Sequence, residues 1–184
     1  LGISNMSLIA RLLGRAPVSD GARTRPVSEH YAAPAVPAPN ERGQLRFDPD
    51  LIHSLESDHR DLVSLFGQIG ERAQAGDFGP IPSMLLKFKT TLEAHLIAEN
   101  VRFYNYVENG LAGDAENYAL MRSFRREMNA IARGVVDFVK KYQISRFSED
   151  DRRAFLDDYQ AVGRLLAERI EREEHSLYPL YQPD

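Results

Sequence analysis

The chain has 184 residues, a formal net charge of −4 and no cysteine. The lack of cysteine excludes disulfides, iron–sulfur clusters, thiolate-bound zinc and a nucleophilic-cysteine mechanism, and it fits a cytoplasmic protein. No apolar run approaches the ~20 residues that span a bilayer, so the sequence predicts no transmembrane segment. Residues 1–47 carry six arginines against three acidic residues, which leaves the rest of the chain strongly acidic and argues against nucleic acid as its main partner.

The first 47 residues differ in composition from the rest and predict an N-terminal arm that is separate from the folded domain. Within residues 6–15, three leucines and Ile9 share one helical face, which favours a short amphipathic peptide that docks on a protein partner or on a membrane surface. A frayed chain end is the alternative. Proline, alanine and small polar residues dominate residues 16–47, and this composition predicts a disordered linker.

From residue 48 to residue 180 the apolar residues recur with helical spacing, which predicts one domain made of four helices. The first three are expected at about residues 48–75, 81–108 and 115–142. The fourth begins after Ser148, a predicted N-cap, and ends before Pro179. Short loops between helices of similar length favour an all-α fold, an up-down-up-down antiparallel four-helix bundle.

One layer of the predicted core is polar. A rise of 1.5 Å per residue, counted from the helix ends, places six inward-facing residues within a slab of ~12 Å. Buried charges are costly unless they are paired or bound to a metal ion, so we interpret these residues as one constellation. They are His59 from the first helix, His95 and Glu99 from the second, Met128 from the third, and Arg169 and Glu173 from the fourth. His175 falls off this seam and is expected to be exposed.

Three motifs in chain order resemble the hemerythrin-like family, also called HHE cation-binding domains. They are Asp58-His59 with Leu62 in the first helix, His95-Leu96-Ile97-Ala98-Glu99 in the second, and Glu173-Glu174-His175-Ser176-Leu177-Tyr178-Pro179 at the end of the fourth. The resemblance covers about residues 48–180. It implies a four-helix bundle, and many members of that family hold two irons bridged by carboxylates.

Carried over by position, the resemblance implies that His59, His95, Glu99 and Glu173 are metal ligands, with the two glutamates as bridging carboxylates. It also implies iron as the cofactor, dioxygen as a candidate partner, and sensing of oxygen, redox state or iron as candidate functions. Glu174 is a further candidate ligand or a supporting residue beside the site.

The sequence departs from the family pattern at two positions. The family usually has histidine where this chain has Met128, and again where it has Arg169, four residues before the final glutamate. Methionine is a poor ligand for hard iron. Arginine has no lone pair to donate and stays protonated. Both departures weaken the same part of the site.

Two interpretations follow from these departures. In the first, a single metal ion binds to the remaining histidines and carboxylates, and Arg169 neutralises the spare carboxylate. In the second, no metal binds, and Arg169 pairs with Glu173 and Glu99 in a buried network whose residual negative charge is balanced by a protonated His59 or His95.

These interpretations predict metal-linked sensing in the first case and a regulatory protein-interaction module, supported by residues 6–15, in the second. An enzyme is not expected, because the sequence contains no serine–histidine–acid set, phosphate-binding loop or nucleotide fingerprint.

Overall fold

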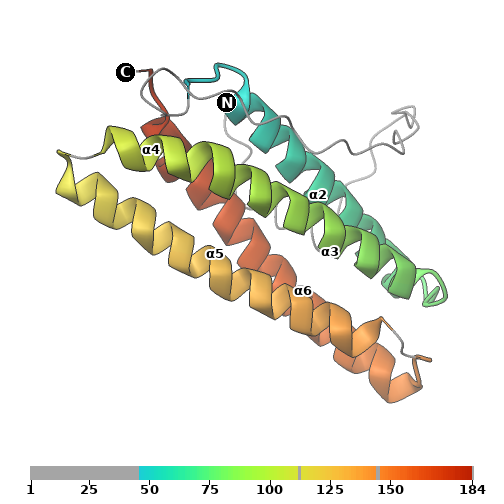
Figure 1. Cartoon of the computed structure of the whole chain (residues 1–184). Helices are drawn as coiled ribbons and strands as arrows, with labels where there is room; N and C mark the ends of the chain where they lie inside the picture. The colour runs from blue at the N-terminus through green and yellow to red at the C-terminus, as the bar shows by residue number, and fades with distance from the viewer. Residues whose placement is uncertain (1–45, 112, 144–145, 184) are drawn as a thin grey trace.

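The computed structural model describes residues 46–111, 113–143 and 146–183, which form four long helical rods (Figure 1). Two of the rods are single α-helices, and the other two continue beyond an α-helix through π-helical or 3₁₀ segments. The first rod is α2 (Leu51–Gln74), and the third is α5 (Ala115–Tyr142). The second consists of α3 (Ile81–Ala98), the π-helical segment η1 (Glu99–Tyr104) and α4 (Asn105–Gly110). The fourth consists of α6 (Glu149–Arg172), the π-helical segment η2 (Glu173–Leu177) and the 3₁₀ turn η3 (Tyr178–Leu180).

Each rod packs against two neighbours, since both α2 and α5 contact α3 on one side and α6 on the other. The described residues contain no strand, so the predicted all-α, up-down-up-down antiparallel four-helix bundle is confirmed. Among the helices that the structure describes, none is long and apolar enough to cross a membrane. The predicted peptide at residues 6–15 and nearly all of the arm over residues 1–47 lie outside the described residues, and so stay predictions.

Local side-chain chemistry determines where the rods begin and end. The hydroxyl of Ser148 accepts a hydrogen bond from the N–H of Asp151 (3.2 Å), whose carboxylate accepts one from the N–H of Ser148 (2.9 Å), so the predicted N-cap forms a capping box. Asp114 caps α5 by accepting from the N–H of Asn117 (3.0 Å). Just beyond α2, Gly76 has a φ of +76°, which glycine adopts without strain. These ends fix which residues face one another at the middle of the bundle.

Two apolar clusters fill the bundle, and the polar layer separates them. One cluster lies toward the loops that join α2 to α3 and α5 to α6, and it includes Phe66, Phe88 and Tyr159. The other lies at the opposite end and includes Phe103 and Tyr178. The five polar side chains predicted to face inward are all buried between these clusters: His59, His95, Glu99, Arg169 and Glu173.

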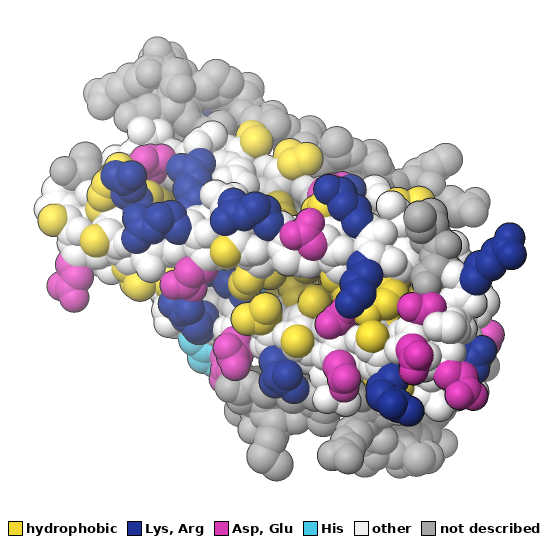
Figure 2. All heavy atoms as spheres, turned by 90° about the horizontal axis from the view of Figure 1, so that it is seen from below, with side chains coloured by type: hydrophobic (Ala, Val, Ile, Leu, Met, Phe, Trp, Pro, Cys, Tyr) yellow, Lys and Arg dark blue, Asp and Glu magenta, His cyan; other side chains and the backbone are white. Residues whose placement is uncertain are grey.

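The outer surface carries charges of both signs. Figure 2 shows one face on which Lys and Arg side chains lie interspersed with Asp and Glu. Ion pairs join α5 to α6, including Lys141 with Asp158 (2.8 Å) and Arg172 with Glu127 (2.5 Å). Exposed pairs of this kind contribute little stability each, so the bundle depends mainly on its apolar clusters.

A stacked aromatic pair in the larger cluster joins α2 to α6. The ring of Tyr159 stacks on Phe66 with centroids 4.3 Å apart, and its hydroxyl donates to the backbone carbonyl of Phe66 at 2.9 Å. This geometry leaves no room at the neighbouring Gly70. A Cβ there would collide with the hydroxyl of Tyr159 and lie 2.6 Å from its ring carbon Cζ.

Gly70→Ala is therefore expected to destabilise the fold by about 1–3 kcal/mol, because the buried tyrosine cannot move away without losing its stacking and its hydrogen bond. The matched control is Gly134→Ala in α5, where a Cβ meets nothing within 4 Å. There the better helix propensity of alanine should stabilise the protein by up to about 1 kcal/mol. Urea unfolding measures both changes, and equal effects of the two substitutions would contradict the packing argument.

Candidate metal centre

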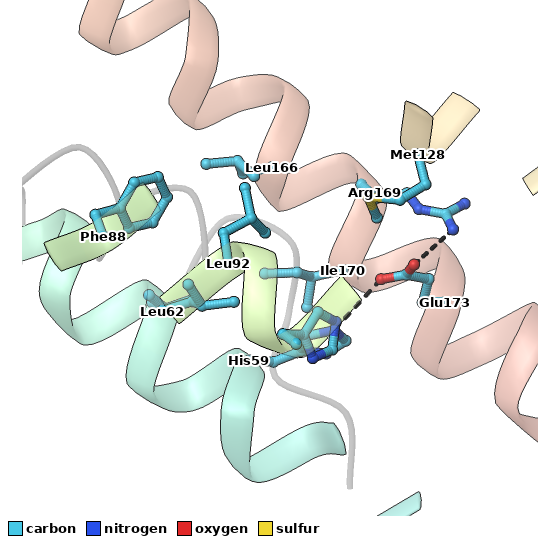
Figure 3. Close-up of a pocket in the computed structure, with 11 residues that line it drawn as sticks. His59, Leu62, Phe88, Leu92, Met128, Leu166, Arg169, Ile170 and Glu173 are labelled. Carbon is cyan, nitrogen blue, oxygen red and sulfur yellow. Dashed lines mark ion pairs between the residues drawn. The ribbon is translucent and has the colours of Figure 1, made fainter. Parts of the chain in front are cut away.

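The polar layer takes one or two side chains from each rod. α2 supplies His59, α3 supplies His95, α5 supplies Met128, α6 supplies Arg169, and the first residue of η2 supplies Glu173. Figure 3 shows His59 and Arg169 on opposite sides of the Glu173 carboxylate, each joined to it by an ion pair.

Both buried glutamates stand at the start of a π-helical segment. Glu99 begins η1 and Glu173 begins η2. In an α-helix the residue five positions later points about 140° away, whereas π-helical i→i+5 bonding brings it back toward the same face. Tyr104 and Tyr178 are the residues five positions after the glutamates, and both are buried. Each of the two rods therefore presents a basic residue, a glutamate and a tyrosine to the layer: His95, Glu99 and Tyr104 in one, and Arg169, Glu173 and Tyr178 in the other.

The two histidines direct one ring nitrogen outward and the other into the layer. His59 Nδ1 lies 3.0 Å from a carboxylate oxygen of Glu174, and His95 Nδ1 lies 3.5 Å from one of Asp58. A carboxylate at Nδ1 fixes the proton there and leaves Nε2 to act as the ligand, which is how metal-binding histidines are usually oriented. His59 Nε2 is 3.3 Å from Glu173 Oε2.

Three residues come close enough to share one ion. His59, His95 and Glu173 each offer a ligand atom, and these atoms lie within 4.8 Å of one another. Ligands bound about 2.0–2.4 Å from a common centre have separations in this range. Within the described residues, the buried Nε2 of His95 has no hydrogen-bond partner, which is costly unless a cation or a water fills the space. The donor set therefore fits a transition metal.

Glu99 adds a carboxyl group that is fully buried. In the part of the chain that the structure describes, neither of its side-chain oxygens has a hydrogen-bond partner. Burial, together with the negative charge of Glu173, raises the pKa of Glu99 well above its usual range, although Arg169 opposes the shift. The metal-free protein therefore favours the protonated form of Glu99, and a bound cation would replace that proton.

Glu173 remains ionised because two cations face it. Burial alone would raise the pKa of Glu173, but the hydrogen bond from His59 and the charge of Arg169 lower it below the usual value. Arg169 Nη2 lies 2.5 Å from Glu173 Oε1 and donates to the Tyr104 hydroxyl at 3.1 Å, while its guanidinium covers the ring of Phe124 at 4.7 Å. The expected pair between Arg169 and Glu173 thus forms. No ion pair with Glu99 is found among the described side chains.

His59 carries a positive charge that faces the carboxylates of Glu173 and Glu174. Burial alone would lower the pKa of His59, but the hydrogen bonds and negative charges of Glu173 and Glu174 outweigh it and raise the pKa to about 9. His95 differs, because burial and the nearby His59 lower its pKa. One imidazolium and one neutral imidazole thus stand side by side, with ring centroids 4.7 Å apart.

A small cavity of about 20 Å³ adjoins the histidines. Its polar wall is His59, His95, Arg169 and Glu173, and apolar side chains with Met128 form the rest (Figure 3). Room for one water needs roughly 10–15 Å³, so the cavity can hold one very small molecule but no organic substrate.

All the predicted site residues lie in this layer or at its rim. Their roles as metal ligands stay a prediction. Glu174 lies at the rim, one-third exposed, where it contacts His59. His175 is exposed and away from the layer, as expected. The sequence did not predict the contacts of Tyr104 and Tyr178, nor the role of Asp58 in orienting His95. The repeated five-residue spacing from glutamate to tyrosine is the signal that would have found the tyrosines.

A family model described as the hemerythrin HHE cation binding domain matches residues 50–181. The chain belongs to this family. Comparisons with curated proteins and with solved structures gave no match. Hemerythrin HHE domains are cation-binding domains by description, which agrees with the cluster of His59, His95 and Glu173.

The metal-free protein is expected to lose stability as pH rises from about 6.5 to about 9. His59 has a raised pKa in the fold, so its contribution is complete below the unfolded value of 6.5 and is lost as pH passes the folded value of about 9. The shift corresponds to roughly 3 kcal/mol of unfolding free energy. Urea unfolding of metal-stripped protein on both sides of this window measures it.

The raised pKa of Glu99 acts in the same direction as that of His59, because a buried carboxyl that stays protonated also favours the fold at lower pH. His59→Gln isolates the histidine part, and the decrease between about pH 6.5 and about pH 9 should be smaller in that variant. A wild-type stability that rises across this window would contradict the assignment.

Proposed function

We propose that this hemerythrin HHE domain binds one transition-metal ion of the iron type through His59, His95 and Glu173, with Glu99 as a further ligand. The observation that carries the proposal is the convergence of one ring nitrogen from each of two histidines and a carboxylate oxygen within 4.8 Å inside the bundle. Two imidazoles and a carboxylate suit Fe(II), Mn(II) or Zn(II). The carboxylates beside both Nδ1 atoms support the same role, because they orient the rings for metal binding.

In this proposal Arg169 takes the place of a second cation. Its guanidinium already neutralises Glu173 from the side opposite His59 (Figure 3). An arginine stays charged at every physiological pH, so it neutralises the carboxylate of Glu173 without a metal ion. Met128 occupies the matching position on α5 and offers only a soft thioether. These two substitutions support one ion rather than two.

We further propose sensing of oxygen, redox state or metal as the output of the site. Bound iron would supply a one-electron redox change and an open coordination position. The chain's own contribution is a small cavity of about 20 Å³ beside the histidines, which has room for a molecule such as dioxygen and excludes organic substrates. This size supports sensing over turnover of an organic substrate.

The alternative is a metal-free bundle that acts as a regulatory interaction module. One observation favours it, which is that Arg169 and His59 already pair with the carboxylates of Glu173 and Glu174. A buried network of this kind can fix the register of the helices without any ion. Metal binding distinguishes the two functions.

The wild-type protein, purified without a tag and reconstituted anaerobically with Fe(II), is expected to hold about one equivalent of iron by plasma mass spectrometry. His95→Ala should lose it, because the imidazole whose Nε2 has no partner among the described residues is removed. His175→Ala is the matched control and should keep its metal, since His175 is exposed. Circular dichroism confirms that both variants fold, and a wild type without metal after reconstitution would favour the alternative.

The double substitution Arg169→His and Met128→His is expected to raise the iron content to about two equivalents. It places an imidazole one helical turn before Glu173, as His95 stands before Glu99, and another on α5 opposite the position of His59. The single substitution Arg169→Met removes the charge without adding a ligand and serves as the control. Unchanged stoichiometry in the double variant would argue against the equivalence of the two halves.

A further inference from the structure

Tyr178 makes a contact that packing alone does not require. Its hydroxyl oxygen lies 3.2 Å from His59 Nε2, the atom that would bind the metal. Its ring is nearly parallel to the imidazole, at an interplanar angle of 12° and a centroid distance of 5.7 Å. The side chain is 3% exposed, so the hydroxyl faces the layer rather than solvent.

His59 Nε2 thus has two oxygen atoms at nearly the same distance, Tyr178 Oη at 3.2 Å and Glu173 Oε2 at 3.3 Å. Two donors bound at right angles to one ion, each about 2.0–2.3 Å from it, lie about 3 Å apart. Each oxygen therefore already has the spacing from His59 Nε2 that neighbouring ligands of one ion have.

The tyrosine that follows the other buried glutamate does not offer the same donor. Tyr104 stands at the equivalent position, five residues after Glu99, but its hydroxyl accepts a hydrogen bond from Arg169 Nη2 at 3.1 Å. The guanidinium thus places a fixed positive charge beside this hydroxyl. The two π-helical segments thus present two tyrosines to the layer, one beside a fixed cation and one beside a metal-binding histidine.

We propose that Tyr178 is a ligand of the metal ion, as a phenolate, together with His59, His95 and Glu173. This proposal rests on the proposed function, because it needs an ion at His59. On binding, the phenol O–H bond breaks, an O–metal bond forms, and one proton is released to the medium, with no electron transferred. A bound cation deprotonates a coordinating side chain that would otherwise stay neutral.

A phenolate makes the site selective for a hard, highly charged ion. Two imidazoles and two anionic oxygens stabilise Fe(III) more than Fe(II), because the trivalent ion gains more from each negative ligand. The ion expected at this centre is therefore ferric iron. The reduction potential of the iron should be lower than that of a centre without Tyr178.

The test uses the full-length chain loaded with iron and oxidised to the ferric state. Ferric phenolate complexes absorb visible light through charge transfer from the phenolate, and resonance Raman excitation in that band enhances the ring vibrations of the bound tyrosine. The wild type is expected to show both signals. Tyr178→Phe should lose them while it keeps its iron on the remaining ligands, and its reduction potential should rise. Tyr104→Phe is the matched control and should keep both signals.

The outcomes separate this proposal from the proposed function. Iron bound without a phenolate band in the wild type overturns the assignment of Tyr178 and leaves the metal site standing. A band that survives in Tyr178→Phe, or that disappears only in Tyr104→Phe, also overturns it. A wild type that takes up no iron overturns both, and metal content measured on the same samples identifies that case.

Discussion

The buried carboxylate of Glu173 is the group on which the rest of the polar layer depends. A lone carboxylate in an apolar core would be strongly destabilising, and here Arg169 faces one of its oxygens and His59 the other. The same charge, with that of Glu174, raises the pKa of His59, and together with burial it raises the pKa of Glu99. Protons therefore occupy donor atoms that a metal would use, so metal and protons compete for one set of atoms.

Arg169 gives this layer a positive charge that does not exchange with solvent. A guanidinium cannot be removed by a chelator, and it holds its charge at any pH at which the protein folds. Its contacts with Glu173, Tyr104 and the ring of Phe124 keep it in place. Under the proposed function, only the half of the layer around His59 and His95 would gain or lose an ion. A single exchangeable position would suit a sensor better than a carrier that needs two ions acting together.

The two π-helical segments give the layer its internal symmetry. Each begins at a buried glutamate and brings a tyrosine five residues later onto the inward face. The basic residue four positions before each glutamate differs between the two segments. His95 leaves a nitrogen available to an ion, whereas Arg169 fills the equivalent space with its own charge.

The sequence by itself determined the four helices, their antiparallel order and the position of the polar layer. Helical spacing and capping residues such as Ser148 are local, and a constant rise per residue converts distance along each helix into height in the bundle. It also identified His59, His95, Glu99, Arg169 and Glu173 as inward-facing. Only the tertiary structure decided the partners of these residues. The ion pair of His59 with Glu174 and the proximity of His95 to Asp58 join different helices, and the α-helical period skips Tyr104 and Tyr178. A π-helical turn depends on how the helix packs against its neighbours, so the α-helical period of the sequence does not reveal it.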